Sequence, residues 1–364
     1  MAPRFQLILN LRTANLAKRV VKRKTGEEST RLHQSSDHSK RAAQTMEPCM
    51  TKFAFIFPGQ GSQFIGMGKD LADTFPAAKA VFQEVDDALD QDLSGLIWGG
   101  SDDELKLTAN TQPALMAVSV AAMRALEEAH GISAGRATFI AGHSLGEYSA
   151  LASAGAISVG DCAKVLRIRG NAMQDAVPAG EGAMAALLGA SPKQAADLCA
   201  IGAKEGPCEI ANDNAPGQIV ISGSKAAIEL ACANAKELGI KKAVPLPVSA
   251  PFHCSLMQPA ADAMAEALAN IQFKAPSAPL VANVTATAGS DPEAIRRQLI
   301  EQVTGQVRWT ESVQYMASEG VELTIEAGAG KVLTVMNRRT VRELEGITMG
   351  TPEEIEAVAA KLNG

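Results

Sequence analysis

A serine inside a short glycine turn is the residue of this 364-residue chain best suited to nucleophilic chemistry. The run Gly142-His143-Ser144-Leu145-Gly146 follows an apolar stretch that predicts a strand and precedes an Ala-rich stretch that predicts a helix. This context is typical of a nucleophile elbow, which exposes the serine hydroxyl at the carboxyl end of a strand. The amide of Leu145 would then face a developing oxyanion. An ordinary Gly-Ser turn is the alternative interpretation.

A serine hydroxyl needs a base, and elimination favours His253. Beyond residue 49 the chain has three histidines, His130, His143 and His253. His130 precedes Gly131 at a predicted helix end, where capping is the simpler role, and the side chain of His143 should point away from that of its neighbour Ser144. His253 lies between a predicted strand and a predicted helix, where the loops of an α/β sheet gather functional groups. A purely structural histidine is the alternative.

Two further segments could complete such a site. The loop 58–62, Pro-Gly-Gln-Gly-Ser, matches neither a Walker loop nor a clean dinucleotide-binding motif. It is either a tight turn or the source of a second oxyanion amide, from Gln60. Arg167 and Arg169 cannot share a helix face, so one of them could point inward and bind a substrate carboxylate. From the spacing alone, two surface arginines are favoured.

The elements that must position these residues alternate between strand and helix, which predicts a mostly parallel sheet covered on both faces. Residues 182–248 differ, because their order βαββαβ is that of a ferredoxin-like unit. We therefore predict an α/β fold with a large subdomain (50–181 and 249–364) and an inserted small subdomain (182–248). The elements predicted for the large subdomain are strands 52–57, 137–141, 280–283 and 322–326, and helices from about 69, at 111–129, after 146, at 165–173, 254–270 and 331–342, and a terminal helix that begins at the capping box 351–354.

Residues 1–49 form a basic stretch that we exclude from the fold. They hold ten Lys and Arg against four Asp and Glu, an excess of +6 that leaves −12 for the rest of the chain. A disordered extension produced by a start site placed too early is favoured over an organelle-targeting peptide, because Glu27, Glu28 and Asp37 are unusual in such peptides.

Composition argues against several classes of function. An acidic pI of about 5.5 with two Trp and two Tyr does not suit a nucleic-acid partner. No run approaches the roughly eighteen apolar residues of a membrane span. The six cysteines are scattered, which argues against a disulfide framework or a structural zinc site and favours a cytoplasmic protein.

Together these segments resemble the malonyl-CoA:acyl-carrier-protein transacylases, a family of bacterial type II fatty acid synthesis. The resemblance covers about residues 50–342. Five motifs occur here in the family's order: 57–63 (Phe-Pro-Gly-Gln-Gly-Ser-Gln), 142–148 (Gly-His-Ser-Leu-Gly-Glu-Tyr), 167–170 (Arg-Ile-Arg-Gly), 211–218 (Ala-Asn-Asp-Asn-Ala-Pro-Gly-Gln) and 251–253 (Pro-Phe-His). The resemblance implies a hydrolase-like α/β subdomain beside the ferredoxin-like one.

The resemblance also implies roles for individual residues. Ser144 would be the nucleophile, His253 the general base, and the amides of Gln60 and Leu145 the oxyanion hole. Arg169 would pair with the malonyl carboxylate, and Asn212 would help shape the site. A backbone carbonyl rather than an Asp would orient the histidine, and we expect that carbonyl at Arg308.

The expected reaction is a ping-pong transfer of malonyl from malonyl-CoA, through an ester on Ser144, to the phosphopantetheine thiol of acyl carrier protein. No metal or cofactor is expected, and a monomer is the simplest expectation. Because carrier proteins are generally acidic, docking needs a local basic patch. The candidates for this patch are Arg338, Arg339, Lys241 and Lys242, although a merely solvated helix face is the alternative for such charge pairs.

Two rival functions share part of this description. A serine hydrolase such as a thioesterase would use Ser144 and His253 but would leave Arg169 without a task. A non-catalytic module that docks carrier protein would keep the fold without turnover.

Overall fold

The computed structural model describes residues 51–248 and 250–364 of the chain. The described residues contain two sheets, one of six strands and one of four. The predictions made for residues 1–49 lie outside the described residues. Within the described residues, no helix combines the length and the apolar character that a membrane crossing requires.

The six-stranded sheet forms the centre of the large subdomain and has the order β10-β9-β1-β2-β7-β8. All neighbours pair in parallel except β7 and β8, which are antiparallel. This confirms the predicted parallel core. The strands are β1 (Phe53–Phe57), β2 (Phe139–Gly142), β7 (Leu280–Val281), β8 (Ala288–Gly289), β9 (Leu323–Ala327) and β10 (Glu345–Met349).

Alternate residues of β1 face two different hydrophobic cores, as the period of two in a strand requires. Phe53, Phe55 and Phe57 pack into the larger core, against helices that include α5, α6 and α7. Ala54 and Ile56 pack into the second core, against α12 and α13. A strand buried on both faces is apolar throughout, which explains the uninterrupted sequence Phe-Ala-Phe-Ile-Phe.

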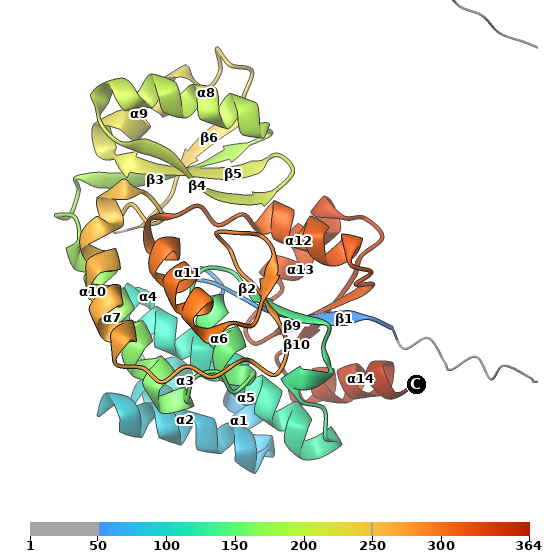
Figure 1. Ribbon diagram of the computed structural model, residues 1–364. Coiled ribbons are helices and arrows are strands. Elements are labelled where there is room, and N and C mark those ends of the chain that lie inside the picture. The colour runs from blue at the N-terminus through green and yellow to red at the C-terminus, as the bar shows by residue number, and fades with distance from the viewer. Residues whose placement is uncertain (1–50, 249) are drawn as a thin grey trace, which may run out of the picture. The chain divides into compact units, whose positions relative to one another are not determined.

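The helices of the large subdomain lie around this sheet (Figure 1). Their bounds are α1 (Lys69–Thr74), α2 (Pro76–Leu89), α3 (Leu93–Gly99), α4 (Asp102–Lys106), α5 (Thr108–His130), α6 (Gly146–Ser153), α7 (Val159–Asp175), α10 (Gln258–Ala269), α11 (Pro292–Thr304), α12 (Trp309–Ser318), α13 (Val332–Thr340) and α14 (Pro352–Asn363). Short 3₁₀ turns lie at Ala134–Arg136, Ala203–Glu205 and Ser255–Met257. No element is predicted between residues 284 and 321, where the structure has β8, α11 and α12.

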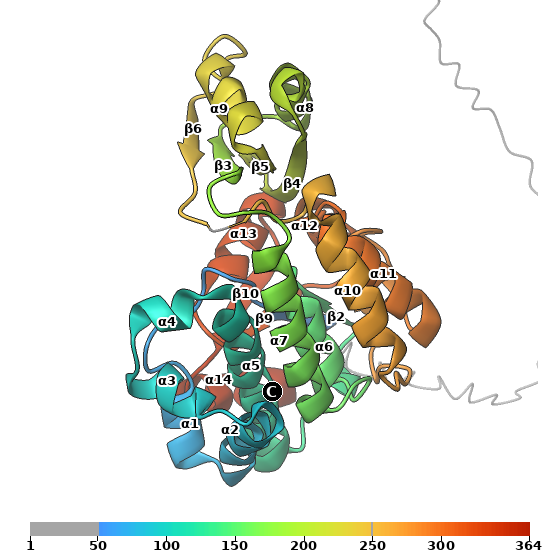
Figure 2. The same cartoon turned by 90° about the vertical axis from the view of Figure 1, so that its left-hand side faces the viewer.

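The small subdomain has the predicted βαββαβ order. Its antiparallel sheet has the order β4-β5-β3-β6, and α8 and α9 lie together beside it (Figures 1 and 2). All six elements fall inside residues 182–248: β3 (Gly182–Leu188), α8 (Pro192–Gly202), β4 (Cys208–Ala215), β5 (Gln218–Ser224), α9 (Lys225–Asn234) and β6 (Lys242–Pro245).

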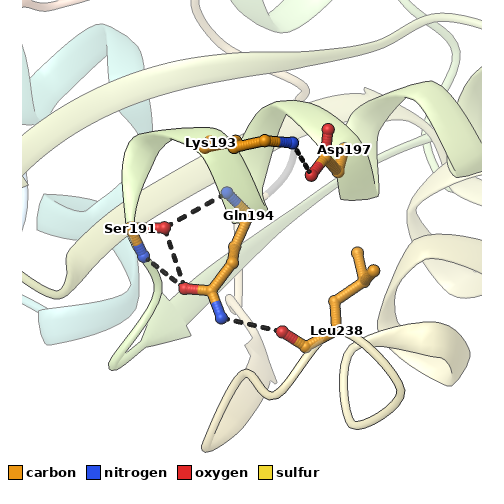
Figure 3. Close-up of polar contacts among 5 residues, drawn as sticks. All are labelled: Ser191, Lys193, Gln194, Asp197 and Leu238. Carbon is orange, nitrogen blue, oxygen red and sulfur yellow. Dashed lines mark hydrogen bonds and ion pairs between the residues drawn. The ribbon is translucent and has the colours of Figure 1, made fainter. Parts of the chain in front are cut away.

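A capping box begins α8 and also ties it to its neighbours (Figure 3). The Ser191 hydroxyl accepts from the Gln194 amide N–H at 3.3 Å, and the Gln194 side-chain oxygen accepts from the Ser191 amide N–H at 2.8 Å. These two contacts satisfy backbone donors that a helix start leaves unpaired. Gln194 Nε2 also donates to the carbonyl of Leu238 at 2.7 Å, which connects the start of α8 to the segment between α9 and β6.

The small sheet is joined to the large subdomain through its edge strand β4. The amide of Val307 donates to the carbonyl of Ala211 at 2.8 Å, and the amide of Asp213 donates to the carbonyl of Val307 at 3.0 Å. Asn212 and Val307 therefore form a parallel bridge between the two subdomains. This bridge brings β4 beside the segment that connects α11 to α12.

Candidate active site

Ser144 occupies a strained turn between β2 and α6, as the elbow interpretation predicts. Its φ of +53° lies in the left-handed region that residues other than glycine rarely adopt. The flanking glycines are required by close approach. A Cβ at Gly142 would lie 1.9 Å from the carbonyl carbon of Gly146, and a Cβ at Gly146 would lie 2.2 Å from the carbonyl oxygen of Phe57. The turn can therefore form only with glycine at both positions.

His253 is the partner of the serine. Its Nε2 lies 2.8 Å from Ser144 Oγ. Its Nδ1 lies 2.9 Å from the carbonyl oxygen of Gln302 and 3.2 Å from that of Gly305. Because carbonyl oxygens can only accept, Nδ1 carries the proton and Nε2 presents its lone pair to the serine hydroxyl. This is the tautomer that a general base needs.

The prediction that the carbonyl of Arg308 orients the histidine is wrong. That carbonyl accepts instead from the amide of Ser312 at 3.0 Å and from its hydroxyl at 2.9 Å, at the start of α12. The two carbonyls that face His253 come from the carboxyl end of α11, where the last carbonyls of a helix have no intrahelical donor. Gln302 lies in the last turn of α11, and Gly305 directly follows it.

Burial keeps His253 neutral. The imidazole is only 5% exposed, and this burial, reinforced by the nearby charge of Arg169, lowers the pKa of His253 to about 3. The hydrogen bonds from Nδ1 to the carbonyls of Gln302 and Gly305 oppose the shift without cancelling it. The resting site therefore holds an uncharged imidazole in contact with the Ser144 hydroxyl.

Arg169 points into the site, whereas Arg167 remains partly exposed on the other side of α7 and donates to Gln91. The Arg169 side chain is 1% exposed, so the inward orientation that the family resemblance implies is correct and two surface arginines are excluded. Its Nη2 donates to Ser144 Oγ at 3.1 Å and to Gln302 Oε1 at 2.9 Å. Its Nη1 donates to Gln112 Oε1 at 2.8 Å. A guanidinium thus lies beside the Ser144 hydroxyl.

A cavity opens over these groups. Its wall comes from both subdomains: Gln60, Gln112, His143, Ser144, Leu145, Arg169, Met173, Met184, Asn212, Leu246, Val248, Phe252 and His253. Asn212 is 7% exposed and lies in this wall, next to the bridge to Val307. The amides of Gln60 and Leu145 donate to no group within the described residues, so both remain available to an oxyanion.

Several polar residues of the site have no counterpart in the sequence-based predictions. Gln112 and Gln302 hold Arg169, and Asn283 accepts from the amide of Ser144 at 2.8 Å. Asn283 ends a predicted strand, so the rule that strand ends carry functional groups could have identified it. Glu147 lies within the motif that contains Ser144. His143 also lines the cavity, and its Nε2 lies 2.8 Å from Asn214 Oδ1.

Three of the four predicted docking cations lie along one end of the small sheet. Gln218 and Lys242 flank Leu188 in register, and Arg339 donates to Gln218 Oε1 at 2.9 Å. The side chain of Lys241 packs over Gly189, the residue after Leu188. Arg338 precedes Arg339 on α13 and is exposed. The structure therefore brings charges from both subdomains together at this end of the small sheet. We call the surface formed by Lys242, Leu188, Gln218 and Arg339 the shared edge.

Comparisons with known proteins find relatives that match most of this chain. The family model described as "Acyl transferase domain" matches residues 54–358. The malonyl CoA-acyl carrier protein transacylase of Bacillus subtilis (strain 168) is 47% identical over 308 residues, which are 84% of this chain and 96% of that protein.

Two solved structures extend the comparison. The acyl-carrier-protein-S-malonyltransferase of Bartonella henselae has a TM-score of 0.84 and 54% identity over 86% of this chain and 100% of its own. A malonyl-transacylase in complex with its type II PKS acyl-carrier protein has a TM-score of 0.82 and 41% identity over 86% of this chain and 100% of its own. This chain belongs to the acyl transferase family and, within it, to the malonyl CoA-acyl carrier protein transacylases.

Proposed function

We propose that this chain moves a malonyl group from malonyl-CoA to the phosphopantetheine thiol of an acyl carrier protein, through an ester on Ser144. The observation that carries the proposal is the buried guanidinium of Arg169, which donates to the nucleophile's own oxygen. A buried cation at that point gives the free carboxylate of a malonyl group a partner, whereas a neutral acyl group leaves the cation unused.

The first half-reaction follows from the contacts of Ser144. His253 Nε2 takes the hydroxyl proton while Oγ attacks the thioester carbon, and the resulting oxyanion accepts from the amides of Gln60 and Leu145. The intermediate then collapses, the C–S bond breaks, and the leaving thiolate of coenzyme A takes the proton from the His253 imidazolium. A malonyl ester on Ser144 and free coenzyme A result.

The second half-reaction reverses these steps with a different thiol. The phosphopantetheine thiol of the carrier protein gives its proton to His253 and attacks the ester carbon. The C–O bond to Ser144 breaks, and the serine regains its proton from the imidazolium. One thioester becomes another, so the exchange is nearly neutral in energy and needs no metal, nucleotide or cofactor.

We further propose that the carrier protein docks on the edge formed by Lys242, Leu188 and Arg339, with Lys241 beside it. Carrier proteins are generally acidic, while residues 50–364 carry a net charge of −12. The net charge of this chain therefore repels an acidic carrier protein at long range. Productive docking requires a local positive surface. The row Lys242–Leu188–Gln218, continued by Arg339, supplies such a surface with one exposed apolar side chain at its centre.

Intact-mass analysis after incubation with malonyl-CoA tests the proposal. We expect an adduct of about 86 Da on the wild-type chain, insensitive to chelators, absent from Ser144→Ala and discharged by holo carrier protein. A wild-type chain that releases coenzyme A and malonate without retaining or transferring the adduct would instead be a hydrolase. A chain that forms no adduct and shows no turnover would be a non-catalytic docking module.

A further inference from the structure

Glu147 is a carboxyl group buried behind the site that the proposed reaction does not use. It lies in the first turn of α6 and is 1% exposed. One oxygen, Oε1, accepts from the backbone amide of Asn283 at 2.5 Å. The other, Oε2, accepts from Gln302 Nε2 at 2.6 Å. Both of its oxygens are thus committed as acceptors.

The two partners of Glu147 reach different parts of the site. Asn283 holds the elbow, since its Oδ1 accepts from the amide of Ser144 at 2.8 Å and its Nδ2 donates to the carbonyl of Gly142 at 2.7 Å. Gln302 holds the base through its backbone carbonyl and holds Arg169 through Oε1. A single carboxyl group therefore connects the nucleophile, the base and the guanidinium.

The acceptors around Gln302 determine which end of its amide faces Arg169. Nε2 lies near three oxygens: Glu147 Oε2 at 2.6 Å, the Ser144 carbonyl at 3.0 Å and Asn283 Oδ1 at 3.3 Å. Only the nitrogen of an amide can donate to oxygens, so this surrounding forces Oε1 toward the guanidinium. The contact to Glu147 is the shortest of the three.

The charge of Arg169 is left uncompensated by this arrangement. Its two amide acceptors, from Gln112 and Gln302, are neutral. Its other close neighbours, the Ser144 hydroxyl at 3.1 Å and the ring of Tyr148 at 5.7 Å, are also uncharged. Burial raises the pKa of Glu147 to about 8, against the opposing effects of its hydrogen bonds to Asn283 and Gln302 and of the Arg169 charge. At neutral pH the carboxyl is therefore mostly uncharged and does not compete for the cation.

We propose that Glu147 is a positioning residue that sets the preference of the site for acyl groups bearing a carboxylate. It fixes the amide of Gln302 so that Arg169 meets a neutral oxygen and keeps its positive charge for the substrate. This inference rests on the proposed function, because it concerns the selectivity of the same acylation step.

Glu147→Gln tests the proposal with almost no change in shape. Both carboxyl oxygens can accept, protonated or not, whereas an amide nitrogen has no free lone pair. In one of the two contacts, to the Asn283 amide or to Gln302 Nε2, two N–H donors then face each other. If the new side chain keeps its oxygen on the fixed backbone amide of Asn283, its nitrogen drives the Gln302 amide to flip and to present Nε2 to Arg169. We expect the ratio of malonyl to acetyl loading on Ser144 to fall by about 10- to 100-fold.

Glu326→Gln is the matched control. Glu326 is also fully buried, and its two oxygens accept from the backbone amides of Leu333 at 3.0 Å and Thr334 at 2.7 Å. The same donor conflict arises there, at the start of α13 and outside the cavity wall. We expect a comparable loss in Tm for both variants, with the malonyl-to-acetyl ratio changed only by Glu147→Gln.

The possible results separate the inference from the proposed function. If malonyl and acetyl loading fall by the same factor in Glu147→Gln, the malonyl-to-acetyl ratio stays unchanged, as expected for the control. That result would overturn the positioning role. A wild-type chain that loads neither acyl group would overturn the proposed function itself. Gln302→Glu adds a third arm, because it places a carboxylate against Arg169. It should abolish the preference for malonyl, and an unchanged ratio there would also contradict the inference.

Discussion

The Nη2 atom of Arg169 and the Oγ atom of Ser144 are hydrogen-bonded at 3.1 Å, so the guanidinium and the serine hydroxyl of this site are direct neighbours. In a malonyl group only two C–C bonds of about 1.5 Å each separate the thioester carbon from the carboxylate carbon. When Oγ attacks the first of these carbons, the carboxylate must lie within a few ångströms of the serine. The short Ser144–Arg169 distance thus matches the length of the acyl group that we propose.

Arg169→Ala should remove the preference for malonyl without removing the nucleophile. A charge-assisted contact of this kind is worth about 1.5–3 kcal/mol, so malonyl loading should slow by about 10- to 100-fold, while acetyl loading stays similar or increases. Single-turnover loading followed by intact mass measures both rates. Arg167→Ala is the control, since Arg167 lies on the same helix and donates to Gln91 outside the cavity wall. Equal loss of malonyl and acetyl loading in Arg169→Ala would contradict the proposed pairing of Arg169 with the malonyl carboxylate.

The pH dependence of loading should differ from that of a free histidine. Burial, together with Arg169, lowers the pKa of His253 to about 3, so the base stays neutral well below neutral pH. We expect the acetyl-loading rate to stay flat between about pH 5 and pH 7. An unperturbed histidine, with a pKa of about 6.5, would instead become mostly protonated and inactive as a base as the pH falls through this range. A one-proton decline centred near pH 6.5 would contradict this expectation.

The same shift has a signed effect on stability. The pKa of His253 is lower in the folded chain than in the unfolded chain, so the folded state binds fewer protons between these values. The contribution of this residue to the free energy of unfolding is complete above about pH 6.5 and is lost as the pH falls toward 3. Urea unfolding of wild type and His253→Gln across this range should therefore converge at the acid end.

Local sequence patterns predict those turns, strands and helices that a few neighbouring residues determine. The sequence predicts the elbow at Ser144 and all six elements of residues 182–248, because turn glycines and the periodicity of strands and helices are visible within a few neighbouring residues. Residues 284–321 show no such pattern, so local patterns do not predict α11. The family resemblance places the orienting carbonyl at Arg308, whereas the carbonyls of Gln302 and Gly305 at the end of α11 face His253.

The polar residues around Arg169 were missed for a different reason. Gln112 and Gln302 come from α5 and α11, and they meet only because the sheet places the ends of these helices together. A glutamine has no charge and no motif that would distinguish it from one on the surface. The inward orientation of Arg169 itself came from family resemblance, since spacing alone favoured a surface position. Long-range convergence of this kind cannot be derived from local periodicity.

Gly170→Ala should displace the helix that carries Arg169. A Cβ at position 170 would lie 2.6 Å from the Cα of Ala109 and 2.8 Å from the carbonyl oxygen of Thr108, both backbone atoms near the start of α5. Backbone cannot move aside cheaply, so we expect a loss of about 1–3 kcal/mol in the free energy of unfolding, and a larger fall in malonyl than in acetyl loading. Gly99→Ala is the control, because nothing lies within 4 Å of a Cβ there. Similar Tm values for the two variants would contradict the packing argument.

Charge reversal on the shared edge should impair transfer to the carrier protein and leave loading from malonyl-CoA intact. Lys242→Glu and Arg339→Glu each place a negative charge where an acidic partner must approach, so KM for the carrier should rise by about tenfold at low salt. The effect should shrink as salt rises, because the Debye length falls to about 10 Å at 0.1 M.

Lys193→Glu is the matched control for this surface. Lys193 belongs to the same subdomain, has a side chain that is 82% exposed and pairs with Asp197 on α8 (Figure 3), so its reversal changes the net charge equally at a position outside the row Lys242–Leu188–Gln218. Steady-state transfer to holo carrier protein at several salt concentrations separates the two positions. If Lys193→Glu and Lys242→Glu raise KM equally, net charge rather than the edge controls encounter. If Lys242→Glu alone raises it, the carrier approaches along the small sheet, and its phosphopantetheine must extend from there to Ser144.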